Sequence, residues 1–138
     1  MPEAHSQKVT HHYTIAYPAH EAREDDPHYV DFHHYRREHV DTAVCAFAAR
    51  RGGDVSECAG GLELHHSKIE WSLINGVDLA LLERDYPGIS NPDEVGAWVE
   101  SAQNMVFYCA AHHRGPGGVH VASSSDFEAS HYLRNLIS

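Results

Sequence analysis

The chain has little of what would assign it to a membrane or to the cell exterior. Its 138 residues include only three cysteines, too few for the dense disulfide framework of a small secreted domain. Its apolar runs are far shorter than the roughly 20 residues that span a bilayer. The N-terminal residues MPEAHSQKVTHHY lack the charged and then apolar layout of a secretory signal. We therefore expect a cytoplasmic protein in a reducing compartment, without a membrane partner.

Basic residues are scarce as well. Ten Lys and Arg stand against 20 Asp and Glu, which gives a net charge of −10 with histidine neutral. Bulk, non-specific adhesion to nucleic acid needs many Lys and Arg, so this composition argues against it. The acidic excess lies in residues 1–31 and 62–103. Any surface that faces phosphate would draw on six arginines: Arg36, Arg37, Arg50, Arg51, Arg114 and Arg134.

Histidine is present in excess. The chain has 14 histidines, and eight of them form adjacent pairs: His11-His12, His33-His34, His65-His66 and His112-His113. Imidazole is the commonest metal ligand and a general base near neutral pH. Each histidine taken singly is better explained as a surface or core side chain, so its context must decide. For the first two pairs we expect solvated rings.

The length and the 42% apolar content indicate one domain, residues 1–138, with a modest core. We divide it into an N-terminal strand and helix extension (1–41), a core (42–122) and a C-terminal helix (123–138). The core contains a helical insert, residues 71–103. Its tryptophans, Trp71 and Trp98, are expected to be buried.

Local patterns place the strands and the first helix. Residues 9–18, VTHHYTIAYP, alternate as a strand does, and residues 31–40, DFHHYRREHV, indicate a short helix. Small and β-branched residues followed by the turn signal RRGGD predict a hairpin from Thr42 to Cys58. LELHH (62–66) and NMVFYC (104–109) predict two further strands.

Capping signals place three more helices. Asp78 caps VDLALLERDYPG, and Pro87-Gly88 ends it. Asn91 caps SNPDEVGAWVESAQ, with Pro92 at its first position. SSSDFEASHYLRNLI predicts a helix over residues 123–137. The expected buried faces of the last two are Val95, Trp98, Val99 and Ala102, and Ala129, Tyr132, Leu133 and Leu136.

Two short segments carry the chemistry. Leu62–His66 ends a strand in two histidines, whose side chains point to opposite faces, so one can face a metal and the other a substrate. Asn104–His113, NMVFYCAAHH, places an asparagine before a strand, a cysteine at its end and a histidine nine residues after the asparagine.

Together these segments resemble the HNH endonuclease family, the ββα-metal finger nucleases. The usual signature there is a strand ending in Asp-His or His-His, a loop, and then Asn-Leu-x-x-Leu-Cys-x-x-Cys-His. The resemblance covers about residues 45–120. It implies an α+β fold, with a ββα-metal (His-Me finger) core, inserted helices and a C-terminal helix. HHRGPGG cannot continue as a regular helix, so the finger helix is short, displaced or replaced by the C-terminal one.

The resemblance also implies a role for each residue. His66 is the general base that takes a proton from a water attacking phosphorus, and Asn104 braces the loop and orients this base. His65 and His113 are ligands of a divalent cation (Mg²⁺, Mn²⁺, Ni²⁺ or Zn²⁺) on the scissile phosphate. His120 is the third ligand if the Gly-rich turn folds back, and a surface histidine otherwise.

A second metal site is open to the cysteines. Many HNH proteins carry a structural zinc ion between two Cys-x-x-Cys knuckles. Here Cys109 and His112 would form one knuckle, with Cys45 and Cys58 as the other pair, although these two are not closely spaced. The alternative is that the cysteines are free and behave as small apolar side chains.

The leading hypothesis is therefore a metal-dependent HNH-type endonuclease that hydrolyses DNA, from a phage, a mobile element or a restriction system. DNA is its expected partner, together with a protein partner or a second copy. The alternative is a catalytically silent, His-rich zinc-binding module that docks proteins through its acidic face. A weaker third hypothesis is another metallohydrolase or an RNA-directed nuclease. Glu63 and Glu70 are expected to be exposed partners of Lys68 or of arginines.

Overall fold

The computed structural model describes residues 5–8, 17–20, 22–23 and 26–133. Within these ranges it contains two strands, six α-helices and two 3₁₀ helices. They are α1 (Tyr29–His39), α2 (Ala46–Ala49), β1 (Leu62–His66), η2 (Trp71–Gly76), α3 (Leu79–Asp85), α4 (Pro92–Val99), η3 (Ala102–Asn104), β2 (Met105–Cys109), α5 (Ala110–Arg114) and α6 (Ser124–Ser130). Most of the strand predicted at residues 9–18 lies outside the described residues. No helix in the described ranges is long and apolar enough to cross a bilayer.

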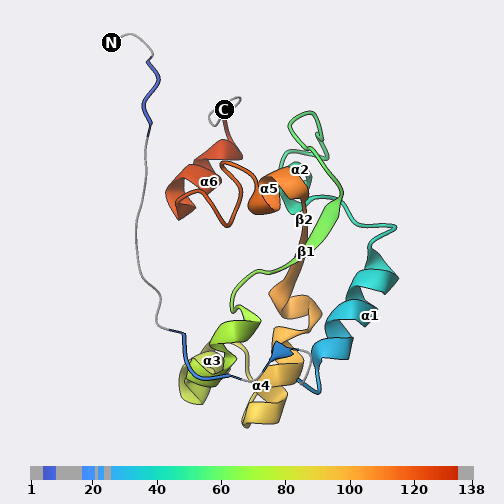
Figure 1. Ribbon diagram of the computed structural model, residues 1–138, viewed down its shortest axis with the longest axis vertical. Helices are drawn as coiled ribbons and strands as arrows, with labels where there is room; N and C mark the ends of the chain where they lie inside the picture. The colour runs from blue at the N-terminus through green and yellow to red at the C-terminus, as the bar shows by residue number, and fades with distance from the viewer. Residues whose placement is uncertain (1–4, 9–16, 21, 24–25, 134–138) are drawn as a thin grey trace.

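The two strands lie at the centre of the molecule (Figure 1). They pair antiparallel along their full length, from Leu62 opposite Cys109 to His66 opposite Met105. Because β2 runs directly into α5, the end of the pair that carries Cys109 also carries the next helix. The mixture of helices with a small antiparallel sheet confirms the α+β class.

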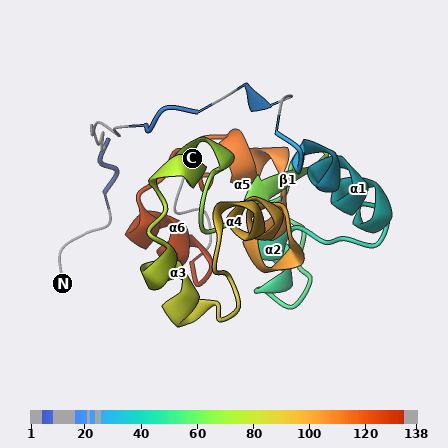
Figure 2. The same cartoon turned by 90° about the horizontal axis from the view of Figure 1, so that it is seen from below.

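Three apolar clusters hold helices around this pair. At one end, α3 and α4 pack with η2 through residues that include Trp71, Leu82 and Trp98. At the other end, α2, α5 and α6 enclose a cluster around Phe47 and Phe127 (Figures 1 and 2). Helix α1 covers one face of the sheet, above a third cluster of Leu64, Met105 and Phe107. Both tryptophans are buried, as expected.

The predicted helix caps are present. The Asp78 carboxylate accepts hydrogen bonds from the backbone N–H groups of Ala80 and Leu81, and α3 begins at the next residue. Asn91 accepts one from Glu94, with Pro92 at the first position of α4. These two helices confirm that local capping signals are sufficient to place a helix start.

The hairpin predicted from Thr42 to Cys58 is wrong. This segment contains the short helix α2, and β1 pairs only with β2 in the sheet that the structure describes. The run Ala46–Ala49 consists largely of alanine, the best helix former, and burial of Phe47 and Ala48 against β2 and α6 holds the turn in place. Tertiary packing therefore decides this segment.

The C-terminal helix is shorter than predicted, because α6 ends at Ser130. Phe127 in α6 and His131 just after it are buried, whereas Tyr132 and Leu133 are 80% and 50% exposed, so the predicted apolar face is wrong there. Leu136 lies outside the described residues. The aromatic rings explain the choice of face, because Phe127 and His131 both pack on Phe47. Similarly, α4 ends at Val99, which leaves Ala102 exposed in η3.

Candidate functional site

Three histidines meet beside the sheet. His65 comes from β1, His113 from α5 and His120 from the turn that follows α5, and one donor atom of each lies within 4.8 Å of the others. The Nε2 atoms of His113 and His120 are 3.1 Å apart. The chain thus brings together three rings that can hold a metal ion.

Backbone hydrogen bonds return the Gly-rich turn to α5. The N–H of Val119 donates to the carbonyl of His112 at 2.8 Å, and the N–H of His120 donates to that of His113 at 3.2 Å. Gly118 allows this approach, since a Cβ there would lie 2.8 Å from the Ala111 carbonyl oxygen. His120 consequently lies beside His113, the position that the sequence left undecided.

The surroundings of the cluster orient the His113 ring and lower the pKa values of the other two histidines. Nδ1 of His113 lies 2.9 Å from a Glu63 carboxylate oxygen, which leaves Nε2 to face the other two rings. Hydrogen bonds from Arg114 and His113 lower the pKa of Glu63 to about 2. Burial, together with the nearby His120 ring, lowers the pKa of His65 from 6.5 to about 4. Nδ1 of His65 is buried and has no hydrogen-bond partner among the described residues, so this nitrogen can act as a metal ligand.

His66 points to the opposite face of β1. Its ring is buried, with Nε2 3.0 Å from Glu100 and Nδ1 3.6 Å from Glu70. The Glu100 side chain is completely buried and also accepts a hydrogen bond from Arg23 at 3.2 Å. Burial alone would lower the pKa of His66, but the hydrogen bonds with Glu100 and Glu70 outweigh it and raise the pKa above 6.5.

One cavity joins both faces of the strand end. It has a volume of about 490 Å³, and its lining includes His65, His66, Glu70, His113 and His120. A larger cavity of about 690 Å³ lies between η2, α3 and Trp98, but no histidine or cysteine lines it. Of these two cavities, the smaller one is therefore the one that the three-histidine group of the described residues lines.

Asn104 supports the segment that follows His66. Its side chain is fully buried, and its Oδ1 accepts hydrogen bonds from the N–H groups of Lys68 and Ile69, each at 3.0 Å. Its Nδ2 donates to the carbonyls of Ile69 and Val99, each at 2.9 Å. The amide thus uses both ends to tie the chain beyond β1 to Val99, the last residue of α4.

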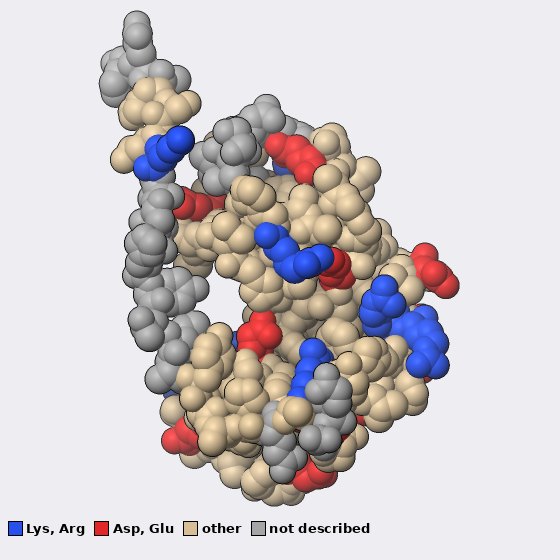
Figure 3. Space-filling view, in the orientation of Figure 1, with Lys and Arg blue, Asp and Glu red and all other residues tan. Residues whose placement is uncertain are grey.

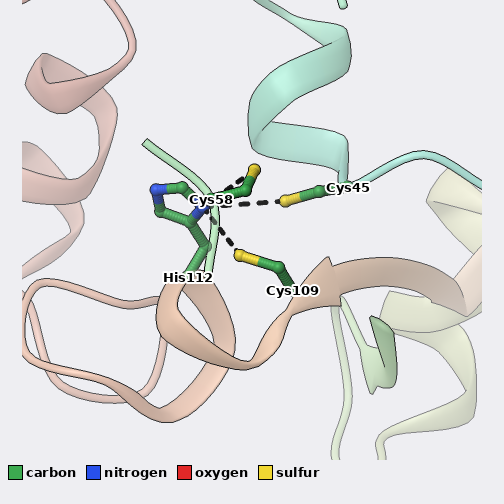
Figure 4. Close-up of side chains that lie close together, drawn as sticks. All are labelled: Cys45, Cys58, Cys109 and His112. Carbon is green, nitrogen blue, oxygen red and sulfur yellow. Dashed lines mark hydrogen bonds between the residues drawn. The ribbon is translucent and has the colours of Figure 1, made fainter. Parts of the chain in front are cut away.

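A second group lies at the other end of the sheet. Cys45, Cys58, Cys109 and His112 converge from α2, the loop before β1, the end of β2 and α5 (Figure 4). Nδ1 of His112 lies 3.1 Å from the sulfur of Cys109 and 3.7 Å from each of the other two sulfurs. The His112 ring stacks on Phe47 at 3.8 Å between centroids, which fixes its direction.

The crowding of three sulfurs suits a bound cation. Burial and the neighbouring thiols of Cys45 and Cys109 raise the pKa of Cys58 to about 12, because a thiolate there would meet like charges. A positive ion among the sulfurs removes this penalty. This donor set can therefore hold a metal ion, and it lies away from the cavity of the three histidines.

A close backbone approach carries Cys58 into this group. The N–H of Ala111 donates to the carbonyl of Ala59 at 3.0 Å, which ties the loop before β1 to α5. Gly60 has a φ of +80°, and a Cβ there would lie 2.6 Å from the Cβ of Ala110. Only glycine fits this position without a shift of the backbone.

Seven of the nine site residues that the sequence singled out lie in these two groups. His66 lines the cavity of the three histidines, whereas Asn104 does not line it and supports the segment after β1. Glu63 pairs with Arg114 as expected, but it is only partly exposed and also holds His113. The expected pairing of Glu70 with Lys68 or an arginine is wrong within the described residues, because Glu70 lies beside His66 and His120 instead. Glu100 and Arg23 were missed. Glu100 is 34 residues from His66 in the chain, and no motif or spacing marks a lone glutamate at the end of a helix.

Comparison with protein-family models, with curated proteins and with solved structures finds no significant match to this chain.

Proposed function

We propose that the protein is a metal-dependent, HNH-type endonuclease that hydrolyses DNA phosphodiester bonds, with β1, β2 and the short helix α5 as a ββα-metal core. The observation that carries the proposal is the end of β1. There, two consecutive histidines line one cavity but have different neighbours. His65 lies with His113 and His120, whereas His66 is hydrogen-bonded to the buried carboxylate of Glu100. A metal ligand beside an oriented base is the arrangement that phosphodiester hydrolysis requires.

His66 is the proposed base. When its Nε2–H donates to Glu100, the tautomer is set and Nδ1 faces the cavity as an acceptor. Nδ1 then takes a proton from the attacking water, and the buried Glu100 carboxylate stabilises the imidazolium that forms. Asn104 holds the following segment and so keeps the ring at the cavity.

His65, His113 and His120 are the proposed ligands of the catalytic cation. When bound there, a divalent ion supplies Lewis-acid polarisation of the scissile phosphate and offsets charge on the departing 3′-oxygen. An all-imidazole set suits Zn²⁺ or Ni²⁺ better than Mg²⁺ or Mn²⁺, which prefer oxygen ligands.

Cys45, Cys58, Cys109 and His112 are the proposed ligands of a structural zinc ion. Tetrahedral zinc, with Zn–S of about 2.3 Å and Zn–N of about 2.0 Å, separates a sulfur from a nitrogen ligand by about 3.5 Å. The three sulfur-to-Nδ1 distances, 3.1, 3.7 and 3.7 Å, lie around this value. Four protein ligands close the coordination shell, which is typical of structural sites.

A catalytically silent zinc-binding module is the second candidate. One observation favours it: both ring nitrogens of His66 lie near carboxylates, Glu100 at 3.0 Å and Glu70 at 3.6 Å. A histidine held on both sides can be a purely structural ion pair. Under this alternative, water never reaches Nδ1.

Plasmid nicking separates the two candidates. Wild-type protein is expected to nick DNA with at least one of Mg²⁺, Mn²⁺, Ni²⁺ or Zn²⁺, and His66→Ala is expected to slow nicking by on the order of 10²- to 10⁴-fold. Glu100→Gln should lower kcat by about 10-fold or more with little change in KM. The amide holds the His66 ring less firmly and does not stabilise the imidazolium by charge, but it does not touch the substrate.

The matched control is His34→Ala, which removes an exposed ring from α1 and should leave the rate unchanged. Equal nicking by wild type and His66→Ala would refute the assignment of the base. Absence of nicking by the wild type with all four metals would favour the silent module.

A further inference from the structure

A second cavity adjoins the proposed active site. It has a volume of about 400 Å³ and lies between α1, β1 and α5. Phe32, Leu64 and His113 line both cavities, so the two are neighbours that meet at a proposed metal ligand. We call the second cavity the α1 groove. Its lining also includes Arg36 of α1 and Arg114 of α5.

The arginines of the α1 groove differ in how far they are already paired. Arg114 donates to Glu63 through Nε at 2.8 Å and through a second nitrogen, so most of its charge is offset. Arg36 is exposed and has no ion-pair partner among the described residues, and the same holds for Arg37, the next residue of α1. Figure 3 shows Lys and Arg gathered over α1 in a protein whose net charge is −10.

The geometry of α1 directs Arg36 into the groove. Phe32 lies four residues earlier, on the same helix face, and lines the groove with it. Glu38, two residues later, projects about 200° away around the helix, so it does not neutralise Arg36. Most other arginines of the described chain are committed: Arg23 to Glu100, Arg50 to Glu128, Arg51 to Glu57 and Arg84 to Asp85.

We infer that the α1 groove binds the sugar–phosphate backbone of the DNA strand next to the cut bond, with Arg36 as its main phosphate contact and Arg37 at its outer edge. This inference rests on the proposed endonuclease function, because it extends the same substrate beyond the histidine cluster. A guanidinium binds phosphate with parallel N–H···O bonds, and such contacts are independent of base sequence. The groove thus supplies locally the positive charge that the whole chain lacks.

Binding is tested apart from cleavage, in the His66→Ala background. A short fluorescein-labelled DNA duplex and its single strand are titrated by fluorescence anisotropy over a series of salt concentrations. Adding Arg36→Gln should weaken affinity about 3- to 10-fold and reduce the slope of log K against log salt by about 0.7 to 0.9. Adding Arg37→Gln as well should reduce both further.

Arg84→Gln is the matched control. It removes the same charge from an exposed arginine on α3, at the α3–α4 end of the molecule, and should leave affinity and slope unchanged. Circular dichroism melts should be the same for all variants, because these arginines lie on the surface. An equal loss with Arg84→Gln would mean that bulk charge, not the groove, binds DNA, and would overturn the inference.

The remaining outcomes separate the groove from the proposed function. If wild type nicks DNA but Arg36→Gln changes neither affinity nor slope, the groove assignment fails and the nuclease stands. If Arg36→Gln weakens binding but wild type never cuts, the nuclease fails and the groove stands. No DNA binding, or binding of phosphatidylserine vesicles in place of DNA, would overturn the inference.

Discussion

The two donor groups of this protein differ in ways that match two different uses of a metal. The group of three cysteines and His112 lies within an apolar cluster, with Cys45 and Cys109 only 3% and 2% exposed, and it offers four donors. The group of three histidines lies on a cavity, includes the exposed His120 and offers three donors. A closed shell of four ligands stabilises a fold, whereas three ligands on a cavity leave room for a substrate or water.

The two groups also differ in the contacts that hold their histidines in place. Around His112 the contacts are apolar, since its ring stacks on Phe47. Around His113 they are ionic, since Glu63 holds Nδ1 and Arg114 holds Glu63. The first environment fixes a ligand by packing, and the second sets its tautomer and its basicity. Three substitutions, one at each of two ligands and one at a supporting carboxylate, should make this difference measurable.

The largest expected effect is that of Cys109→Ser on folding. If this group holds a structural zinc ion, loss of one thiolate removes a large part of the binding free energy that stabilises the fold. We expect Tm to fall by roughly 10 °C or more, and the zinc content measured by mass spectrometry to fall with it. Ala48→Ser is the control, because it places the same hydroxyl in the same apolar cluster at a residue that is not a proposed ligand. A similar loss of Tm in both would mean that packing alone accounts for the effect.

His65→Ala should separate the two groups. It removes a proposed ligand whose Nδ1 is buried and has no hydrogen-bond partner within the described chain, so Tm without added metal should change by only a few degrees. Nicking should be lost. Wild type should also gain up to about 2.7 kcal/mol of stability at a metal concentration 100 times the dissociation constant, and the variant should not. A thermal-shift titration with Zn²⁺, Ni²⁺ and Mn²⁺ measures this. An equal shift in both proteins would show that His65 is not a ligand.

The smallest effect is that of Glu63→Gln. The neutral amide still reaches His113 but no longer strengthens its ring as a ligand, so metal affinity at the three histidines should fall about 10- to 100-fold. The zinc content of the cysteine group should not change, which isothermal titration calorimetry combined with metal analysis can show. The control is Glu83→Gln on the exposed face of α3. A fall in affinity in the control would point to a general effect of the net charge.

Much of the site could be predicted because its residues are close together in the chain. Cys109, His112 and His113 are placed by one strand and one turn of helix, and His65 and His66 by the alternation of a strand. Glu100 could not be predicted, since its role depends on the end of α4 lying beside His66, which is 34 residues away in the chain. The hairpin predicted at residues 42–58 is wrong for a related reason. Burial of Phe47 in a cluster of distant residues favours a short helix over a strand in this segment.

The sequence by itself determined the two strands, the caps of α3 and α4, the buried tryptophans and the set of candidate ligands. Each of these depends on residues within a few positions of one another, where backbone geometry acts directly. Only the tertiary structure decided that Cys45 and Cys58 meet Cys109, that His120 returns to His113 and that Glu100 reaches His66. These contacts join distant segments, and they form because burial of apolar surface in three clusters brings those segments together.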